Sequence, residues 1–473
     1  MRRFTARAAL LCWTVRFSPH LSRAARRLKP EVPLPVHARV LIVAKDDAVA
    51  GPLSAGLDRL GWRTVTARGP FAAIAALADL GLEAAVVDTA GMDANEGQVL
   101  ARRLKAAAAP RRLAVVAVGR QPDGPSAFDL AMVAPVHPAQ AALRLEQLVR
   151  ATVAEEELEL RRETFAERGR QLDAPPVPDH PFRVLCIGEP APRFLALSNA
   201  LGNAGAEAVA AFTSFTAFDY LHERPFDAVV LWAGEGSAEA LSITAGMRRN
   251  TRLFHIPAVL LVRPGAEFGE SEAFHRGVSD LASTDEAPDD VAARVIELAR
   301  AYRRAAVIRG ALERARGSGL MDPVTGLFTK DLFASHLARL AAASRARQRS
   351  MTVCVLRVAD RPEIAAARAE GWLDRALPQI GSMVGRLVRA EDTAARLAPE
   401  VFALALPATP QAQARAAADR IAAVIGCTAF ESGPGRKPFV LEFEIGVAEL
   451  TPGENAAKAL ERAAHHLAPA RTG

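Results

Sequence analysis

The chain has 473 residues, of which 50% are hydrophobic and 24% charged, and this length predicts about three domains of roughly 150 residues each. The sequence has no apolar run near the roughly 18 residues needed to cross a bilayer, which argues against a membrane span. The net charge is +6, but the basic residues form no stripe with interleaved aromatics, so we expect no nucleic-acid partner.

Residues 1–36 differ from the rest of the chain. Segment 1–29 is rich in arginine and has no acid, and its apolar stretch, Ala8 to Trp13, is short. We interpret this part as a disordered extension or as the product of a start codon assigned too early. A basic helix that touches a membrane is the alternative.

From residue 37 the pattern alternates between short apolar runs and amphipathic segments, which is typical of a parallel sheet with helices between its strands. A long helix is expected from about residue 138, and it continues into the highly charged segment 154–171 before the Pro-rich sequence DAPPVPDHP. The strands of this first unit are expected at 38–44, 63–66, 84–88, 113–119 and 129–134.

The pattern then repeats, with strands expected at 182–188, 226–234, 256–262 and 277–284 and a helix from about 288 to Arg316. The domains expected are a basic extension (1–36), a first α/β domain (37–153), a charged helix and Pro-rich linker (154–180), a second α/β domain (181–305), a helical linker (306–320) and a third domain (321–473).

Both repeats resemble the receiver domain of bacterial response regulators. The first repeat has Asp46, Asp47 and Asp88 at the ends of its first and third strands. The resemblance implies that these acids hold Mg²⁺ and that Asp88 accepts a phosphoryl group. The hydroxyl and lysine that would read this charge are replaced by Val118 and Ala134. The alternative is that the three acids cap strand ends or helix N-termini.

The second repeat departs further from the receiver pattern. Glu189 is its only acid after the first strand, and Trp232 falls at the phosphoacceptor position. Val262 and Thr284 stand at the hydroxyl and lysine positions. An indole accepts no phosphoryl group, so we interpret this domain as a dimerisation or docking module, an arrangement that resembles PleD-type regulators.

The third region resembles GGDEF domains along its whole length. MDPVTGLFTKDLF (321–333) is similar to the entry segment of that family, RAEDTAARLAPEVFALALP (389–407) to its central hairpin, and EIGVA (444–448) to a late strand. The fold class expected is therefore α/β, with two doubly wound, flavodoxin-like receiver domains followed by a nucleotidyl-cyclase-like GGDEF domain.

The five residues that give this family its name are Ala398, Pro399, Glu400, Val401 and Phe402 in this chain. Diguanylate cyclases use the two glycines to bring main chain close to phosphate and the acids for metal and proton chemistry. A proline lacks an N–H and fixes φ near −65°, so we expect that a hairpin needing glycine geometry cannot form unchanged.

Further cyclase positions are altered. The resemblance places Arg357 where the family has a metal-binding aspartate, and a cation there repels Mg²⁺. Thr329 stands at the guanine-binding asparagine, and Asp374 aligns with a guanine-reading aspartate. We expect a domain without cyclase activity. The alternative is a residual cyclase that uses Glu400 and Asp360 to make cyclic di-GMP from two GTP.

Arg389, Asp392 and Arg420 match the family's allosteric inhibitory site. The resemblance implies that they bind cyclic di-GMP, as a stacked dimer of the nucleotide. Guanidinium groups suit phosphate oxygens and guanine O6 and N7, and a carboxylate accepts from guanine N–H groups. The alternative for Arg389 and Asp392 is a surface ion pair worth under about 1 kcal/mol.

The whole-chain order resembles the PopA-type regulators of alphaproteobacteria. That resemblance implies a cytoplasmic cyclic di-GMP effector in cell-cycle control, found at the cell pole and delivering a regulator to a protease. We also expect a homodimer and a sensor kinase or phosphotransfer protein acting on Asp88. A purely structural module that binds no nucleotide is a third interpretation.

Overall fold

The computed structural model describes residues 39–119, 126–173, 178–233, 237–265, 269–317, 319–433 and 435–470. The extension 1–36 lies outside the described residues, so its interpretation stays a prediction. Within the described ranges the strands form three five-stranded sheets. No helix in these ranges is both long enough and apolar enough to span a bilayer.

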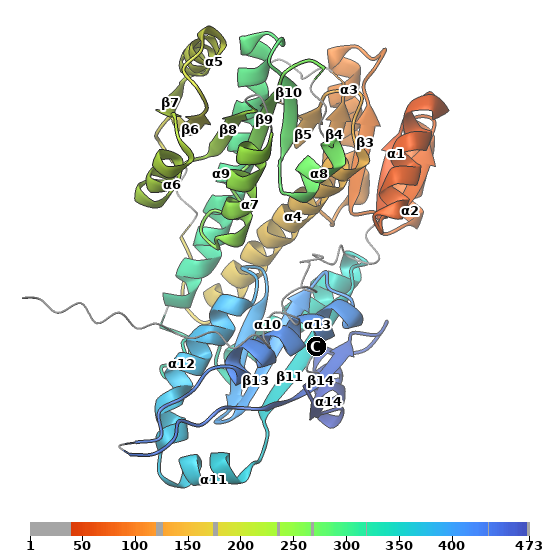
Figure 1. Cartoon of the computed structure of the whole chain (residues 1–473). Helices are drawn as coiled ribbons and strands as arrows, with labels where there is room; N and C mark the ends of the chain where they lie inside the picture. Colours follow the sequence, from red (N-terminus) through yellow and green to blue (C-terminus); the bar gives the residue numbers. More distant parts are fainter. Residues whose placement is uncertain are drawn as a thin grey trace, which may run out of the picture. The chain divides into compact units, whose positions relative to one another are not determined.

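The first sheet is parallel, with the strand order β2-β1-β3-β4-β5. Its central strands are buried on both faces, because crossover helices cover both sides of a parallel sheet. Figure 1 shows these elements. They are β1 (Arg39–Val43), α1 (Asp47–Arg59), β2 (Arg63–Ala67), α2 (Pro70–Asp79), β3 (Ala84–Asp88), α3 (Ala94–Ala108), β4 (Ala114–Val118), β5 (Leu130–Met132) and α4 (Pro138–Ala166).

The second sheet repeats this order as β10-β9-β8-β6-β7, again with parallel strands. Both sheets have the flavodoxin-like order, so the predicted doubly wound fold is confirmed. The elements are β6 (Phe182–Ile187), α5 (Pro192–Asn203), β7 (Ala206–Ala211), α6 (Ser214–Glu223), β8 (Ala228–Trp232), α7 (Ala238–Arg249), β9 (Ala258–Val262), α8 (Glu270–His275), β10 (Asp280–Ser283), α9 (Pro288–Arg314) and the 3₁₀ turn η2 (Ala315–Gly317).

The third sheet is antiparallel, with the order β12-β13-β11-β14-β15. Gly446 in β14 allows the helix α14 to approach, because a Cβ there would lie 1.7 Å from the carbonyl oxygen of Ala463. The elements are α10 (Lys330–Ala346), β11 (Met351–Val358), α11 (Pro362–Ala369), α12 (Trp372–Leu387), β12 (Thr393–Ala398), β13 (Val401–Pro407), α13 (Gln411–Gly426), β14 (Phe443–Glu449), α14 (Ala456–His465) and β15 (Ala468–Pro469).

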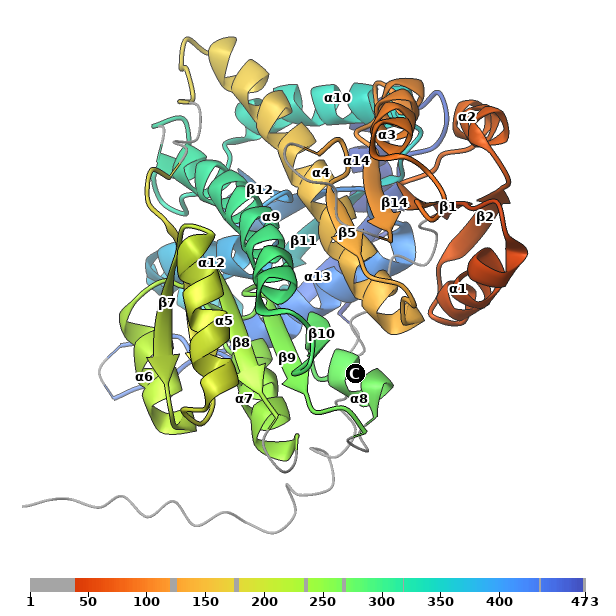
Figure 2. The same ribbon diagram turned by 90° about the horizontal axis from the view of Figure 1, so that it is seen from above.

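The helix α4 begins in the first α/β domain and ends in the core of the third. Leu160 and Phe165 are buried among apolar residues of the C-terminal domain, and the Phe165 ring packs edge-on against Phe328 with centroids 5.9 Å apart. α4 and α9 lie side by side in both views (Figures 1 and 2). The charged segment after residue 154 is therefore helical to Ala166. It connects the first domain to the rest of the chain, and its last turns also pack in the core of the C-terminal domain.

We expect Phe165→Ala to lower the free energy of unfolding of the C-terminal domain by about 3–5 kcal/mol, because it removes a fully buried ring and leaves a cavity. Urea unfolding followed by tryptophan fluorescence, to which Trp372 contributes, measures this change. The control is Phe71→Ala, which truncates a ring that is 83% exposed and should change stability by no more than about 0.5 kcal/mol. Equal effects of the two variants would contradict the packing of α4 described above.

Candidate functional site

A tight turn connects α12 to β12 and contains two of the predicted site residues. The N–H of Arg389 donates to Asp392 Oδ2 over 2.9 Å, and the N–H of Asp392 donates to the carbonyl oxygen of Arg389 over 3.2 Å. Asp392 is only 6% exposed, whereas Arg389 is exposed. The Asp392 carboxylate therefore closes the turn by accepting from the main-chain N–H of Arg389. The guanidinium of Arg389 takes no part in these two bonds and lies on the surface.

The third predicted residue, Arg420, reaches the same turn from α13. Its Nη2 donates to the carbonyl oxygen of Leu387, the last residue of α12, over 3.4 Å. Arg420 is exposed, like Arg389. The fold thus brings Arg389, Asp392 and Arg420 together at one end of α12, with two of them in the turn and the third on α13.

The environment of Asp392 disfavours its charged form. Burial and the neighbouring Glu391 raise the pKa of Asp392 to about 7, and the positive charge and N–H of Arg389 only partly offset this. Its Oδ1 is buried without a hydrogen-bond partner. A buried acceptor without a partner costs free energy.

Two arginines of α4 also lie at this turn, and neither was predicted from the sequence. Arg161 Nη2 donates to the carbonyl oxygens of Ala390 and Asp392, over 3.2 and 2.9 Å. Burial and the nearby charge of Arg389 lower the pKa of Arg150. The only sequence signal was the spacing of Glu157 and Arg161, four residues apart, which indicates an ion pair along one helix but gives no sign that the pair is buried.

The hairpin between β12 and β13 forms with Pro399 in its turn. Pro399 and Glu400 make a two-residue turn between Ala398 and Val401, which are paired across the strands. Neither turn residue has a positive φ, and the register shifts between Arg396 and Ala398. The turn therefore has a different geometry from one that depends on glycine.

The acids around this hairpin are all paired with arginines. Arg368 donates to both carboxylate oxygens of Glu400, over 2.6 and 2.7 Å, and contacts Asp360 at 3.3 Å. These two acids raise the pKa of Arg368. Arg357, at the position of the metal-binding aspartate, donates to Glu444 on the neighbouring strand over 2.8 Å. The acids at the end of the sheet where the resemblance places the cyclase chemistry are thus paired with arginines.

The remaining cyclase positions have other local roles. Thr329 caps α10 by accepting a hydrogen bond from the N–H of Leu332 over 3.3 Å. Asp374 is exposed in the first turn of α12. Phe402 is fully buried in β13 and belongs to the core. The side chain of Asp360, the acid proposed for a residual cyclase, is 82% exposed.

The three acids of the first receiver-like domain have separate partners. Asp46 caps α1 through the N–H of Ala48 over 2.8 Å, and Asp47 pairs with Arg68. Asp88, the last residue of β3, accepts from the N–H of Ala90 over 3.0 Å. Among the described residues no three His, Cys, Asp or Glu side chains are grouped so that they could hold a metal ion. Magnesium binding by these acids stays a prediction.

Trp232 occupies the position in the second domain that Asp88 has in the first. It is the last residue of β8, and its ring packs against Phe194 with centroids 4.6 Å apart. Val118 and Val262 end β4 and β9 in the corresponding places. The strand ends of the second domain therefore carry apolar groups where a phosphorylated receiver carries polar ones.

A family model described as "Diguanylate cyclase, GGDEF domain" matches residues 319–472. Residues 319–472 form a GGDEF domain. The response regulator PleD of Caulobacter vibrioides is 24% identical over 230 residues, which cover 49% of this chain and 50% of PleD. The chain thus matches about half the length of this relative.

Solved GGDEF structures are also similar to the C-terminal part of the chain. The GGDEF domain of FimX from Pseudomonas aeruginosa is 23% identical, with a TM-score of 0.29, and covers 31% of this chain and 91% of its own. The GGDEF domain of DgcB from Caulobacter crescentus, solved in complex with c-di-GMP, is 21% identical, with a TM-score of 0.29, and covers 31% and 84%.

We expect the stability difference between Asp392→Asn and the wild type to depend on pH. Because the pKa of Asp392 is raised in the native state, its protonated carboxyl contributes to the free energy of unfolding, and this contribution is fully present below about pH 4. It is lost as the pH rises through about 7. The Asn variant should therefore gain up to a few kcal/mol relative to the wild type between pH 5 and 8. Urea unfolding at four pH values measures the difference.

The control for this comparison is Asp374→Asn, which changes an exposed carboxyl on α12 and should show no such trend. Glu391, Glu157 and Arg389 face Asp392 and are unchanged in both variants. A difference that is constant from pH 5 to 8 would contradict the raised pKa of Asp392.

Proposed function

We propose that this protein is a cyclic di-GMP-binding signalling effector whose GGDEF domain does not synthesise the nucleotide. The observation that carries the proposal is the convergence of Arg389, Asp392 and Arg420 at one end of α12. Two exposed guanidiniums beside a carboxylate whose buried Oδ1 has no hydrogen-bond partner suit a ligand that combines phosphate with guanine edges.

The state of the hairpin supports the absence of synthesis. Phosphoryl transfer between two GTP molecules needs metal ions and main chain that approaches phosphate closely. Here a proline occupies the turn, Glu400 is held by Arg368, and Arg357 places a cation at the metal position. Each of these features opposes Mg²⁺ binding or phosphate approach, whereas none of them touches the Arg389–Asp392 turn.

The rest of the proposed role concerns the N-terminal domains. We propose that Asp88 accepts a phosphoryl group from a sensor kinase or phosphotransfer protein, with Mg²⁺ held by the acids of the first domain. The second domain, with Trp232 at the acceptor position, serves dimerisation or docking. The proposed setting is cytoplasmic and polar, in cell-cycle control, with the protein acting as an adaptor for proteolysis.

We expect the wild-type chain to bind cyclic di-GMP in isothermal titration calorimetry, and the double variant Arg389→Ala, Asp392→Ala to lose at least 30-fold in affinity. Truncation removes the phosphate-binding fork and the guanine acceptor together. The matched control is Arg375→Ala, which removes an exposed arginine from the same helix α12 without touching the turn. Equal affinity of the wild type and the double variant would refute the proposed site.

We also expect no cyclic di-GMP above the level of a protein-free control when the chain is incubated with GTP and Mg²⁺ or Mn²⁺. The physical reason is that Arg368 neutralises Glu400 and Arg357 opposes metal binding. Product formation that disappears in Glu400→Gln or Asp360→Asn would contradict this and favour the residual cyclase.

A further inference from the structure

The buried arginine Arg161 belongs to the helix α4, which starts in the first receiver-like domain, yet most of its contacts lie in the GGDEF domain, and one further bond goes to the carbonyl oxygen of Leu312 on α9 over 3.4 Å. Only 1% of its side chain is exposed. Its Nε donates to Glu157 Oε1 over 2.6 Å, and the guanidinium lies 5.7 Å from the centroid of the Phe328 ring. Arginine at such a site presents a planar set of donors in a fixed geometry, which the flexible ammonium of lysine cannot reproduce.

Three acceptors of Arg161 lie at or beside the turn of the proposed nucleotide site. Its Nη2 donates to the carbonyl oxygens of Ala390 and Asp392 and to Thr393 Oγ1, over 3.2, 2.9 and 3.1 Å. These oxygens lie on both sides of Glu391, so one guanidinium fixes the peptide groups that carry the carboxylate of Asp392. A shift of Arg161 relative to β12 would change where this carboxylate points.

Glu157 connects this arginine to the rest of the GGDEF domain. Its Oε1 also lies 2.9 Å from His336 Nε2 and accepts from Thr393 Oγ1 over 3.2 Å. Burial opposes the ionisation of Glu157, but His336 and Arg161 outweigh it and lower the pKa of this carboxyl. The carboxylate is therefore charged, and the pair is held in place because separation would leave a buried charge without a partner.

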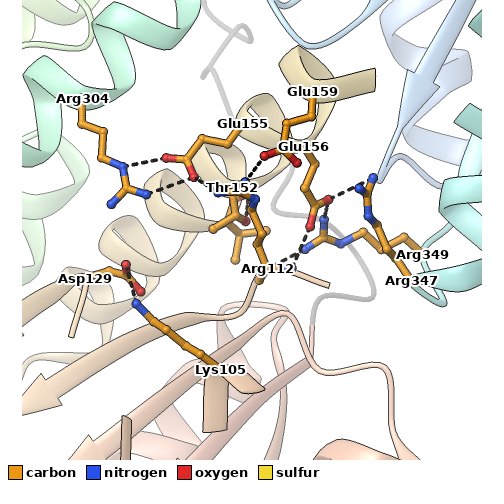
Figure 3. Close-up of polar contacts among 11 residues, drawn as sticks. Lys105, Arg112, Asp129, Thr152, Glu155, Glu156, Glu159, Arg304, Arg347 and Arg349 are labelled. Carbon is orange, nitrogen blue, oxygen red and sulfur yellow. Dashed lines mark hydrogen bonds and ion pairs between the residues drawn. The ribbon is translucent and has the colours of Figure 1, made fainter. Parts of the chain in front are cut away.

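The two preceding glutamates hold α4 to other parts of the chain. Figure 3 shows Glu155 pointing toward Arg304 of α9 and Glu156 pointing toward Arg347 and Arg349 of the GGDEF domain. Arg112 of the first domain donates to Glu155 through its guanidinium and to Glu156 through its main-chain N–H, over 2.9 and 2.7 Å. A movement of either receiver-like domain would therefore be transmitted to α4 through Glu155 or Glu156, which lie within two residues of Glu157.

We propose that Arg161 is a positioning residue of the cyclic di-GMP site, through which the position of α4 sets the affinity of that site and the bound ligand in turn stabilises α4. The inference rests on the proposed function, because it assigns the regulation of the same site. Such a coupling is reciprocal. If a change in the position of α4 alters ligand affinity by some factor, ligand binding shifts the equilibrium between the positions of α4 by the same factor.

The test compares Arg161→Lys with Arg349→Lys in the full chain. The side chains of both arginines are buried and ion-paired to a glutamate of α4, but Arg349 contacts Glu156 and Glu83 and does not touch residues 390–393. Calorimetry with cyclic di-GMP should show at least a tenfold loss of affinity for Arg161→Lys and less than a threefold loss for Arg349→Lys. Equal losses would mean a general destabilisation and would overturn the inference.

A second measurement reports the reciprocal effect. Cyclic di-GMP should slow amide hydrogen exchange in residues 157–165 of α4 in the wild type, and this protection should be absent in Arg161→Lys. Should Arg161→Lys fail to fold, Thr393→Val takes its place, because it removes one hydroxyl of the same network at nearly constant volume. Full protection of α4 by ligand in the variant would overturn the inference.

The outcomes separate the two proposals. A wild-type chain that does not bind cyclic di-GMP would remove the proposed function and the inference with it. A wild-type chain that binds, together with an Arg161→Lys variant of unchanged affinity, would leave the proposed function standing and remove only the role of Arg161.

Discussion

The structure depends on one buried ionic contact, the pair of Glu157 and Arg161 on α4, which lies inside a domain other than the one in which that helix begins. A charge pair at 1% exposure costs least where its remaining hydrogen-bonding groups find partners. His336, Thr393 and the carbonyl oxygens of Ala390 and Asp392 supply most of them from the GGDEF domain, Leu312 on α9 supplies one more carbonyl, and Glu157 Oε2 is buried without a partner. The last turns of α4 are consequently a structural part of that domain.

This arrangement separates two sites that the GGDEF domain offers. At the hairpin, cyclase chemistry needs main chain that can approach phosphate and acids that can bind metal. In this chain a proline lies in the turn, and the nearby acids make three contacts with arginines. The site at the end of α12 depends on side chains, and its main chain is held by Arg161. Under the proposed function, the loss of cyclase chemistry at the hairpin leaves the nucleotide site at the end of α12 in place, and that site stays attached to α4.

Most strands of the two parallel sheets and the third domain could be predicted from the sequence, because buried parallel strands appear as short apolar runs such as residues 113–119 and because GGDEF segments follow one another in order. The strand β7 was not located, because most of its residues are not fully buried and form no such run. The convergence of Arg389 and Arg420 followed only from family resemblance. The role of α4 could not be predicted, since Glu155, Glu156 and Glu157 in sequence have the pattern of a solvated helix. Their partners, Arg304, Arg349 and His336, lie in distant segments, and only the fold brings them together.

Native-state hydrogen exchange at increasing urea tests most directly whether the end of α4 belongs to the GGDEF core. We expect the amides of residues 157–165 to exchange with the same opening free energy, and the same dependence on urea, as those of β11 and β13. Amides of α4 that exchange as freely as a solvated helix, while β11 and β13 stay protected, would contradict this expectation.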